Sequence, residues 1–321
     1  MDKQRKFVDL ASEAKRMKII WVPDLEYNSF DIRYCSNEPP SRISEDRLTY
    51  TGAKMCCSAL ARGCVTTGNW YFEARIDEPD PSWKDFKLRG WESEETVGGL
   101  LESVPALRNG LRPSVSIGFG TRLSRFDGPI GSNVFGCSIS QEGCRVMQDN
   151  KDITSPEDER LDLKPGDIVG CAIKLGEPTT KFPDPRGIAA MWPFVRKALL
   201  IDVTNPESIE EAKVLNEGSQ LMFSVNGKWR KTVVKDFYCV EYHPGVSTFM
   251  GGSVTLNLGP KFTFEPPDSS YMPANSMENS MYPCKEELLR FWILGDTSVL
   301  SEGAEINRDY YKVVSDSPTE Q

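Results

Sequence analysis

The chain has 321 residues, 39% of them hydrophobic, so it can bury a sizeable core as two ordinary domains or as one large all-β domain with appendages. Its formal net charge of −9 argues against broad electrostatic binding to nucleic acid or to an anionic membrane, because both require an excess of Lys and Arg on some face. The nine cysteines do not have the spacing of small secreted scaffolds, and neither a membrane-spanning apolar run nor a secretory signal is evident, which favours a cytosolic or nuclear protein.

Residues 1–18 are expected to form a charged N-terminal arm. From about residue 19 the sequence changes to short runs of β-branched and aromatic residues, separated by Gly, Pro, Asn and Asp. This pattern is typical of an antiparallel meander. The runs are Arg47 to Tyr50, WYFEARI after Gly68-Asn69, SVSIGFG (114–120), DIVGCAIKL (167–175), QLMFSVNGKW (220–229), GGSVTLNLG (251–259) and KFTFEPP (261–267).

The run WYFEARI alternates in the manner of a half-buried strand. Its period of two predicts one face toward water, with Tyr71, Glu73 and Arg75. The other face is predicted to meet a core, with Trp70, Phe72, Ala74 and Ile76.

Turn signals support the same all-β assignment. Asn226-Gly227 predicts a tight type I′ hairpin, because both central residues of that turn need a positive φ. Pro165-Gly166 predicts a turn directly before another strand.

Two long insertions interrupt the strands, at about 79–113 and about 176–219. The first has no clear hydrophobic period, and the second is rich in Pro before it becomes helix-like. The main domain is therefore predicted to span 19–275 with these two loops inserted.

Residues 276–300 are predicted to be a connector followed by a short helix within PCKEELLRFWILG. Leu288, Leu289, Trp292 and Ile293 are among apolar residues that cover nearly every side of this helix. An isolated helix this short is marginal in water, so it is expected to dock either on its own domain or on a partner. The polar residues 301–321 are expected to be disordered.

Catalytic motifs are not evident. The single histidine, His243 in EYHPG, is expected in a loop or turn, and no C-x-x-C pair or phosphate-binding loop occurs. Carboxylate pairs such as Asp77-Glu78 and Glu94-Glu95 resemble solvated loop charge more than a glycosidase site. We therefore expect a binding protein with no catalytic residues, no metal, no cofactor and no small-molecule substrate.

An ordered set of motifs resembles the SPRY domain, a two-sheet antiparallel sandwich of the concanavalin-like jelly-roll type. The set is GNWYFEARIDE, SVSIGFGTR, GDIVGCAIKL, MFSVNGKW and TLNLGPKFTFEPP. Within SPRY proteins the chain is similar to the "absent, small or homeotic discs two" family and its fungal Bre counterpart. That similarity covers roughly residues 40–275, and its most specific block is YHPGVSTFMGGSVTLNLGPKFTFEPPDSSYMP.

The resemblance implies a non-catalytic, nuclear subunit of a COMPASS or mixed-lineage-leukaemia type complex, which methylates the fourth lysine of histone three. Three partners follow from it: a SET-domain methyltransferase, a WD-repeat β-propeller subunit held by the SPRY domain, and a Dumpy-thirty-type dimer held by the C-terminal helix. Contact with chromatin is expected to be indirect, and no membrane contact is expected. Leu288, Leu289, Trp292 and Ile293 are the implied helix anchors.

The resemblance also implies a partner pocket beside the strand SVSIGFG. Pro129 in DGPIG matches the wall proline of the family, and the family's tyrosine falls near Met55 or Cys56. Its two arginines fall at Ser116 and Ser140.

An acidic partner segment would therefore lose two charge-assisted contacts, each worth on the order of 1.5 to 3 kcal/mol in favourable settings. Three explanations stay open: Arg122 or Arg125 compensates, the partner segment is less acidic, or the surface has lost that partner.

Two other functions remain as alternatives. One is a SPRY adaptor for other protein partners, such as substrates of a ubiquitin ligase, although no RING-type cysteine array is evident. The other is a jelly-roll protein that binds or hydrolyses carbohydrate.

Overall fold

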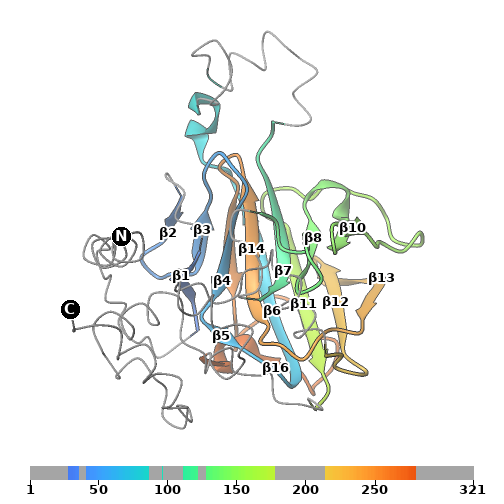
Figure 1. Ribbon diagram of the computed structural model, residues 1–321. Helices are drawn as coiled ribbons and strands as arrows, with labels where there is room; N and C mark the ends of the chain where they lie inside the picture. Colours follow the sequence, from blue (N-terminus) through green and yellow to red (C-terminus); the bar gives the residue numbers. More distant parts are fainter. Residues whose placement is uncertain are drawn as a thin grey trace, which may run out of the picture. The chain divides into compact units, whose positions relative to one another are not determined.

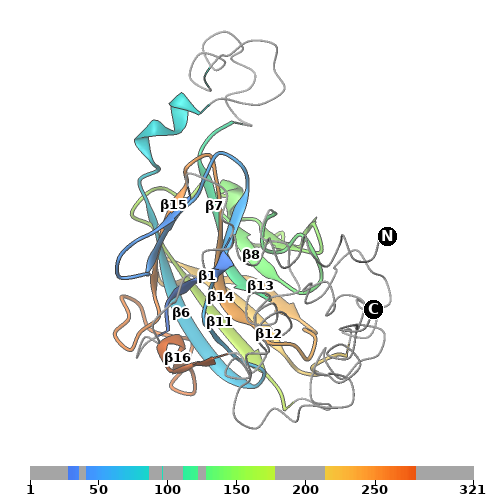
Figure 2. The same ribbon diagram turned by 60° about the vertical axis from the view of Figure 1, so that its left-hand side comes forward.

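The computed structural model describes residues 28–35, 41–86, 96, 111–121, 128–177 and 214–279, all within one compact unit. Two stacked sheets make up this unit (Figures 1 and 2). Every strand pairing is antiparallel except that of β16 with β6. The all-β sandwich predicted from the sequence is confirmed.

The seven-stranded sheet contains, in spatial order, β1 (Phe30–Cys35), β4 (Cys57–Ala61), β14 (His243–Phe249), β7 (Ser114–Gly120), β8 (Cys137–Ser140), β9 (Val146–Gln148) and β10 (Lys151–Asp152). The eight-stranded sheet contains β13 (Lys228–Lys235), β12 (Gln220–Val225), β11 (Ile168–Leu175), β6 (Gly68–Asp77), β15 (Ser253–Asn257), β3 (Thr49–Thr51) and β2 (Arg42–Ile43), with β16 (Met272–Pro273) beside β6. The short strands β5 (Gly63–Cys64) and β17 (Glu278–Asn279) form a separate ribbon, and single 3₁₀ turns occupy η1 (Pro81–Asp85), η3 (Glu142–Cys144) and η5 (Ala274–Ser276).

Apolar side chains on the inner faces hold the two sheets together. Phe72 on β6 and Phe119 on β7 meet edge to face with ring centroids 5.1 Å apart, and both are fully buried. Burying one such side chain contributes about 1.5 to 3 kcal/mol. This inner layer fixes which residues of each strand are left on the outer face, since successive side chains alternate.

Polar and aromatic contacts join the two sheets at both edges of the sandwich. At one edge, the rings of Phe30 on β1 and Tyr50 on β3 lie 5.8 Å apart. At the other edge, the buried Asp158 in the loop after β10 accepts hydrogen bonds from β13: from the backbone N–H groups of Lys231 and Thr232 at 2.7 and 2.9 Å, and from the Thr232 hydroxyl at 2.5 Å.

Several predicted elements are confirmed. SVSIGFG forms β7 over its full length, and DIVGCAIKL contains β11. Asn226 and Gly227 both have positive φ, 48° and 78°, and link β12 to β13 as the hairpin signal predicted.

Two predictions for the eight-stranded sheet were wrong, and for one physical reason. Tyr71 and Glu73 are buried, and residues 261–267 form no strand. The Glu73 carboxylate accepts hydrogen bonds from the backbone N–H groups of Thr263 and Phe264, at 2.8 and 2.7 Å, and the Phe262 ring packs on Tyr71. The segment therefore gives its N–H groups to a side chain instead of a neighbouring strand, and it covers the face that was expected to meet water.

Parts of the predicted organisation lie outside the described residues. These parts are the arm 1–18, most of the two insertions, the C-terminal helix and the tail 301–321. Within the first insertion, Pro81–Asp85 form η1.

The described residues include eight cysteines and no disulfide. Burial raises the pKa of the Cys137 and Cys171 thiols, which keeps them protonated in the core. None of the helices in the described part of the chain has the length and apolar character needed to span a bilayer.

Replacing Asp158 with Asn should destabilise the fold by about 2 to 4 kcal/mol, because the amide cannot satisfy the donors of β13 and leaves Arg230, 3.6 Å from the carboxylate, without its counter-charge. Burial opposes ionisation of Asp158, but the hydrogen bonds from Thr232 and Lys231 and the nearby Arg230 outweigh it and lower the pKa. A lowered pKa stabilises the fold at neutral pH, and this contribution is lost as the pH falls below the ordinary value of 3.8.

Urea denaturation of the wild type and of Asp158→Asn between pH 3 and pH 7 would measure both effects. The difference between the two proteins should shrink toward the acid end. The exposed neighbour Glu157 offers a control, since Glu157→Gln should change stability by less than about 0.5 kcal/mol. Equal stability of the wild type and Asp158→Asn at pH 7 would contradict the role of Asp158 as a clamp.

Candidate partner-binding surface

A row of four serines crosses the outer face of the seven-stranded sheet. The register pairs Ser247 on β14 with Ser58 on β4 and with Ser116 on β7. Ser116 in turn pairs with Ser140 on β8. Cross-strand partners lie on the same face of a sheet, so these residues form one continuous line, called here the serine row. Ser58 and Ser247 are buried, whereas Ser116 and Ser140 are half-buried.

The loop segment Gly128–Gly131 (GPIG) is fixed to the buried half of the serine row by a closed chain of hydrogen bonds. The Ile130 N–H donates to the Ser247 hydroxyl at 2.8 Å, and the Ser58 hydroxyl donates to the Gly128 carbonyl at 2.5 Å. The two hydroxyls lie 2.8 Å apart. Because the Ser58 proton is used on Gly128, Ser247 must donate to Ser58, so the chain starts and ends on the same loop.

A third serine completes the attachment of the loop. The Ser138 hydroxyl donates to the Ile130 carbonyl at 2.7 Å, so both backbone polar groups of Ile130 are satisfied by the sheet. Such a fully satisfied buried network makes the loop rigid.

Glycines in the sheet leave the space that the loop fills. A Cβ at Gly245 would lie 2.7 Å from Cδ1 of Ile130 and 2.5 Å from Cδ2 of Leu60, and a Cβ at Gly120 would lie 3.4 Å from Cδ1 of Ile130 and 2.8 Å from Cδ2 of Leu60. The buried Ile130 side chain therefore sits in a trough that only glycine permits. Pro129, the next residue back along the loop, stays exposed.

Four of the site residues predicted from the sequence lie on or beside this surface. Ser116 and Ser140 are direct cross-strand neighbours. Pro129 stands on the GPIG segment above the serine row. Cys56 is half-buried and directly precedes β4, where strand alternation places it on the same side as Ser58.

The other predicted site residues lie outside the described part of the chain. They are Arg122 and Arg125, which were candidates to supply positive charge, and the helix anchors Leu288, Leu289, Trp292 and Ile293. Their roles stay predictions.

The pair of positions at which the family resemblance places arginines carries two neutral hydroxyls here. Ser116 and Ser140 can exchange hydrogen bonds with a partner backbone or side chain, but they cannot neutralise a carboxylate. At these two positions the surface is therefore polar and uncharged.

The buried serines that fix the loop, Ser58, Ser138 and Ser247, were not predicted. The sequence did carry a signal for them, because each serine stands between two inward-facing residues, in CSALA, CSIS and HPGVSTF. Their alignment across strands depends on the pairing register, which one sequence does not reveal.

The position predicted for His243 was wrong. It is the first residue of β14 and is fully buried, with Nδ1 3.0 Å from the Ala61 carbonyl oxygen. The Pro-Gly dipeptide that follows suggested a turn, but β14 is a central strand. The missing N–H of Pro244 is tolerated there because Gly245 and the residues beyond it continue the ladder with β4 and β7.

The curated proteins to which the chain is similar include two that share a name. The chain is 26% identical over 269 residues to the Set1/Ash2 histone methyltransferase complex subunit ASH2 of Drosophila melanogaster, covering 82% of this chain and 41% of that protein. It is 24% identical over 256 residues to the Set1/Ash2 histone methyltransferase complex subunit ash-2 of Caenorhabditis elegans, covering 75% and 39%. The chain thus spans about two fifths of the length of these relatives.

No family model matches the sequence. Among solved structures, the SPRY domain of human HERC1 is similar, with a TM-score of 0.38 and 14% identity over 71% of this chain and 96% of that one.

The fold is a two-sheet antiparallel sandwich, the architecture that the SPRY-like motifs predicted. Over most of its length the chain is similar to two subunits named ASH2, the family that its motifs resemble.

Replacing Ser247 with Ala should loosen the GPIG loop, since it leaves the Ile130 N–H without its acceptor and breaks the hydroxyl chain. An unsatisfied buried donor costs about 1 to 3 kcal/mol. Amide hydrogen exchange at Ile130 should accelerate in this variant. Ser116→Ala, in the same row but outside the chain of hydrogen bonds, should leave that exchange rate unchanged, and equal rates in all three proteins would contradict the attachment.

Proposed function

We propose that the chain is a non-catalytic subunit of a Set1/Ash2-type histone methyltransferase complex. The observation that supports this most strongly is the similarity to two subunits with that name over 75% and 82% of the chain. An antiparallel sandwich that holds a loop rigidly above its outer face suits protein binding. The proposed location is the nucleus, with chromatin reached through partners.

The proposed partners are those that the family resemblance implied: a SET-domain methyltransferase that acts on the fourth lysine of histone three, a WD-repeat β-propeller and a Dumpy-thirty-type dimer. The surface beside the GPIG loop is the proposed propeller-subunit site, with Cys56, Ser116, Pro129 and Ser140 among its residues. Leu288, Leu289, Trp292 and Ile293 are proposed to anchor the dimer, by the helix-in-groove mode of recognition.

One observation favours a second candidate function. The uncharged pair Ser116 and Ser140 suits an extended segment with few carboxylates better than a strongly acidic one. An adaptor that binds other protein partners through the same face is therefore the alternative.

Affinity purification of the full chain from its source cell, followed by mass spectrometry, tests the complex and the helix together. The wild type should bring down a SET-domain protein, a β-propeller protein and a small helical dimer. Leu289→Glu combined with Trp292→Glu should lose only the dimer, because charge on the apolar anchors prevents burial of the helix.

A charge-matched control on the same predicted helix is Lys285→Gln combined with Arg290→Gln, which also lowers the net charge by two and should retain all three partners. Absence of any SET-domain protein from the wild-type sample would reject the proposed complex. Retention of the dimer by the Leu289 and Trp292 variant would reject the helix as its binding site.

Restoring positive charge to the serine row tests the proposed surface separately. Ser116→Arg combined with Ser140→Arg should raise affinity for a labelled peptide of Asp, Glu and one Trp by about 10- to 100-fold, because two cross-strand guanidinium groups can pair with its carboxylates. Fluorescence anisotropy at two salt concentrations would measure it, and the gain should shrink at high salt.

The eight-stranded sheet supplies a matched control for added charge. Met222 and Val233 are cross-strand neighbours that are not buried, so Met222→Arg combined with Val233→Arg adds the same charge elsewhere. An equal gain in both double variants would mean that the peptide follows net charge and not this surface.

A further inference from the structure

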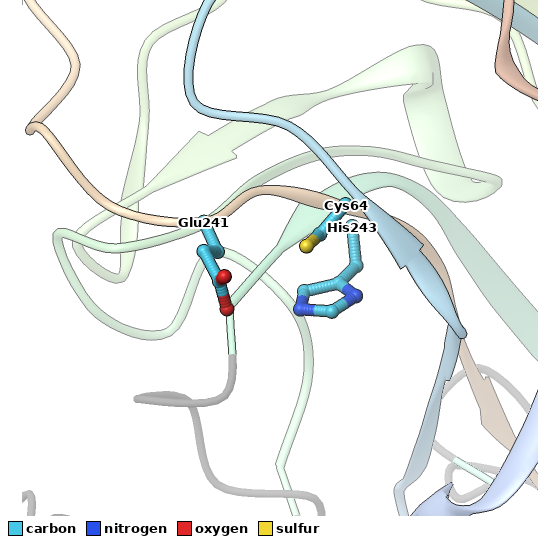
Figure 3. Close-up of side chains that lie close together, drawn as sticks. All are labelled: Cys64, Glu241 and His243. Atoms are coloured by element: carbon cyan, nitrogen blue, oxygen red, sulfur yellow. The ribbon is translucent and has the colours of Figure 1, made fainter. Parts of the chain in front are cut away.

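Three side chains with metal-binding atoms converge beside the first residue of β14, in the part of the chain that the structure describes. They are Cys64 on β5, Glu241 just before β14, and His243 at its start. One ligand atom from each lies within 4.8 Å of the other two, and the exposed fractions are 7%, 8% and 0%. Figure 3 shows the thiol, the carboxylate and the imidazole facing a common space.

Strand pairing explains why residues so far apart in sequence meet here. Val65 and Tyr242 form an antiparallel bridge with hydrogen bonds of 3.0 and 2.9 Å between their backbones. That register sets Cys64 opposite His243, on the face of the bridge away from Val65 and Tyr242. Glu241 lies two residues before His243, so alternation turns its side chain to the same face.

The histidine ring is oriented by the backbone. Nδ1 lies 3.0 Å from the Ala61 carbonyl oxygen, which can only accept, so Nδ1 carries a proton and donates it. In the neutral ring Nε2 then holds the lone pair. Histidines that bind metals commonly donate their other ring N–H to a backbone carbonyl in this way.

We propose that Cys64, Glu241 and His243 bind one zinc ion. Thiolate, imidazole and carboxylate are all zinc ligands, and the thiolate favours zinc over magnesium or calcium. The dication also neutralises a carboxylate and a thiolate that are buried together. Ligand atoms around tetrahedral zinc lie about 3.3 to 3.8 Å apart, so no pair has to close by more than about 1.5 Å, and water takes the fourth position.

This site was not expected from the sequence, which lacks a C-x-x-C pair. It is also independent of the proposed function. Its consequence is mechanical: His243 pairs with Gly120, the last residue of β7, and a Cβ at Gly120 would lie 3.4 Å from Ile130 of the GPIG loop. A zinc ion here joins β5 to β14 directly beside the strand end that supports the loop.

Metal analysis of the purified full chain tests the proposal. Protein expressed with zinc and passed through gel filtration should carry about one zinc per chain by inductively coupled plasma mass spectrometry. Removal of zinc by a chelator should lower the Tm, and added zinc should restore it. Cobalt substitution should produce a thiolate-to-cobalt charge-transfer band together with visible bands of tetrahedral cobalt.

Variants identify the ligands. Cys64→Ser should lose the charge-transfer band, and Glu241→Gln should lower zinc affinity by about 10-fold or more. Cys239→Ser, which removes another buried cysteine of the same region, should keep both the zinc and the band. The wild-type measurement stands even where a variant fails to fold.

Two results would overturn the proposal. A folded wild type with less than about 0.1 zinc per chain and no cobalt bands would show that the three side chains meet in the core without binding a metal. Full zinc retention and an unchanged charge-transfer band in Cys64→Ser would place the metal elsewhere in the chain.

Discussion

The alternation of side chains across the two packed sheets is the constraint on which the other features depend. Because the inner layer, exemplified by Phe72 against Phe119, has to be apolar, every second residue of β4, β14, β7 and β8 is assigned to the outer face. The pairing register then aligns those outward residues into the serine row. The same alternation places the serines that bind the GPIG loop. Packing in the core therefore determines the geometry of the outer surface.

Sequence reasoning was most successful where one local rule decides the outcome. The alternation in SVSIGFG and the positive-φ demand of Asn226-Gly227 each need no distant partner, and both are confirmed. It failed where a distant segment supplied the partner. Glu73 is buried because the N–H groups of Thr263 and Phe264 donate to it, and no local pattern around Glu73 indicates donors nearly two hundred residues away.

In the candidate site, too, some residues could be predicted from local motifs and others depend on distant segments of the chain. Motif resemblance located Ser116, Ser140, Cys56 and Pro129, and the pairing of Ser116 with Ser140 supports treating them as one surface. The residues that hold the loop in place could not be found in this way, because their function arises from register. The cluster of Cys64 with Glu241 and His243 is a further case, since a single backbone bridge brings together three residues that no spacing rule connects.

The glycines on the outer face of the seven-stranded sheet limit how this surface can change over evolutionary time. Gly118 has a carbonyl oxygen where its first side-chain carbon would be, and Gly245 is overlain by Ile130 and Leu60, so neither position admits even alanine without moving a strand or the loop. Diversification is thereby confined to the margin, at half-buried positions such as Ser116 and Ser140 and at the exposed Pro129. Substitutions at these few positions can change which partner binds, while the glycines of the sheet and the position of the loop stay the same.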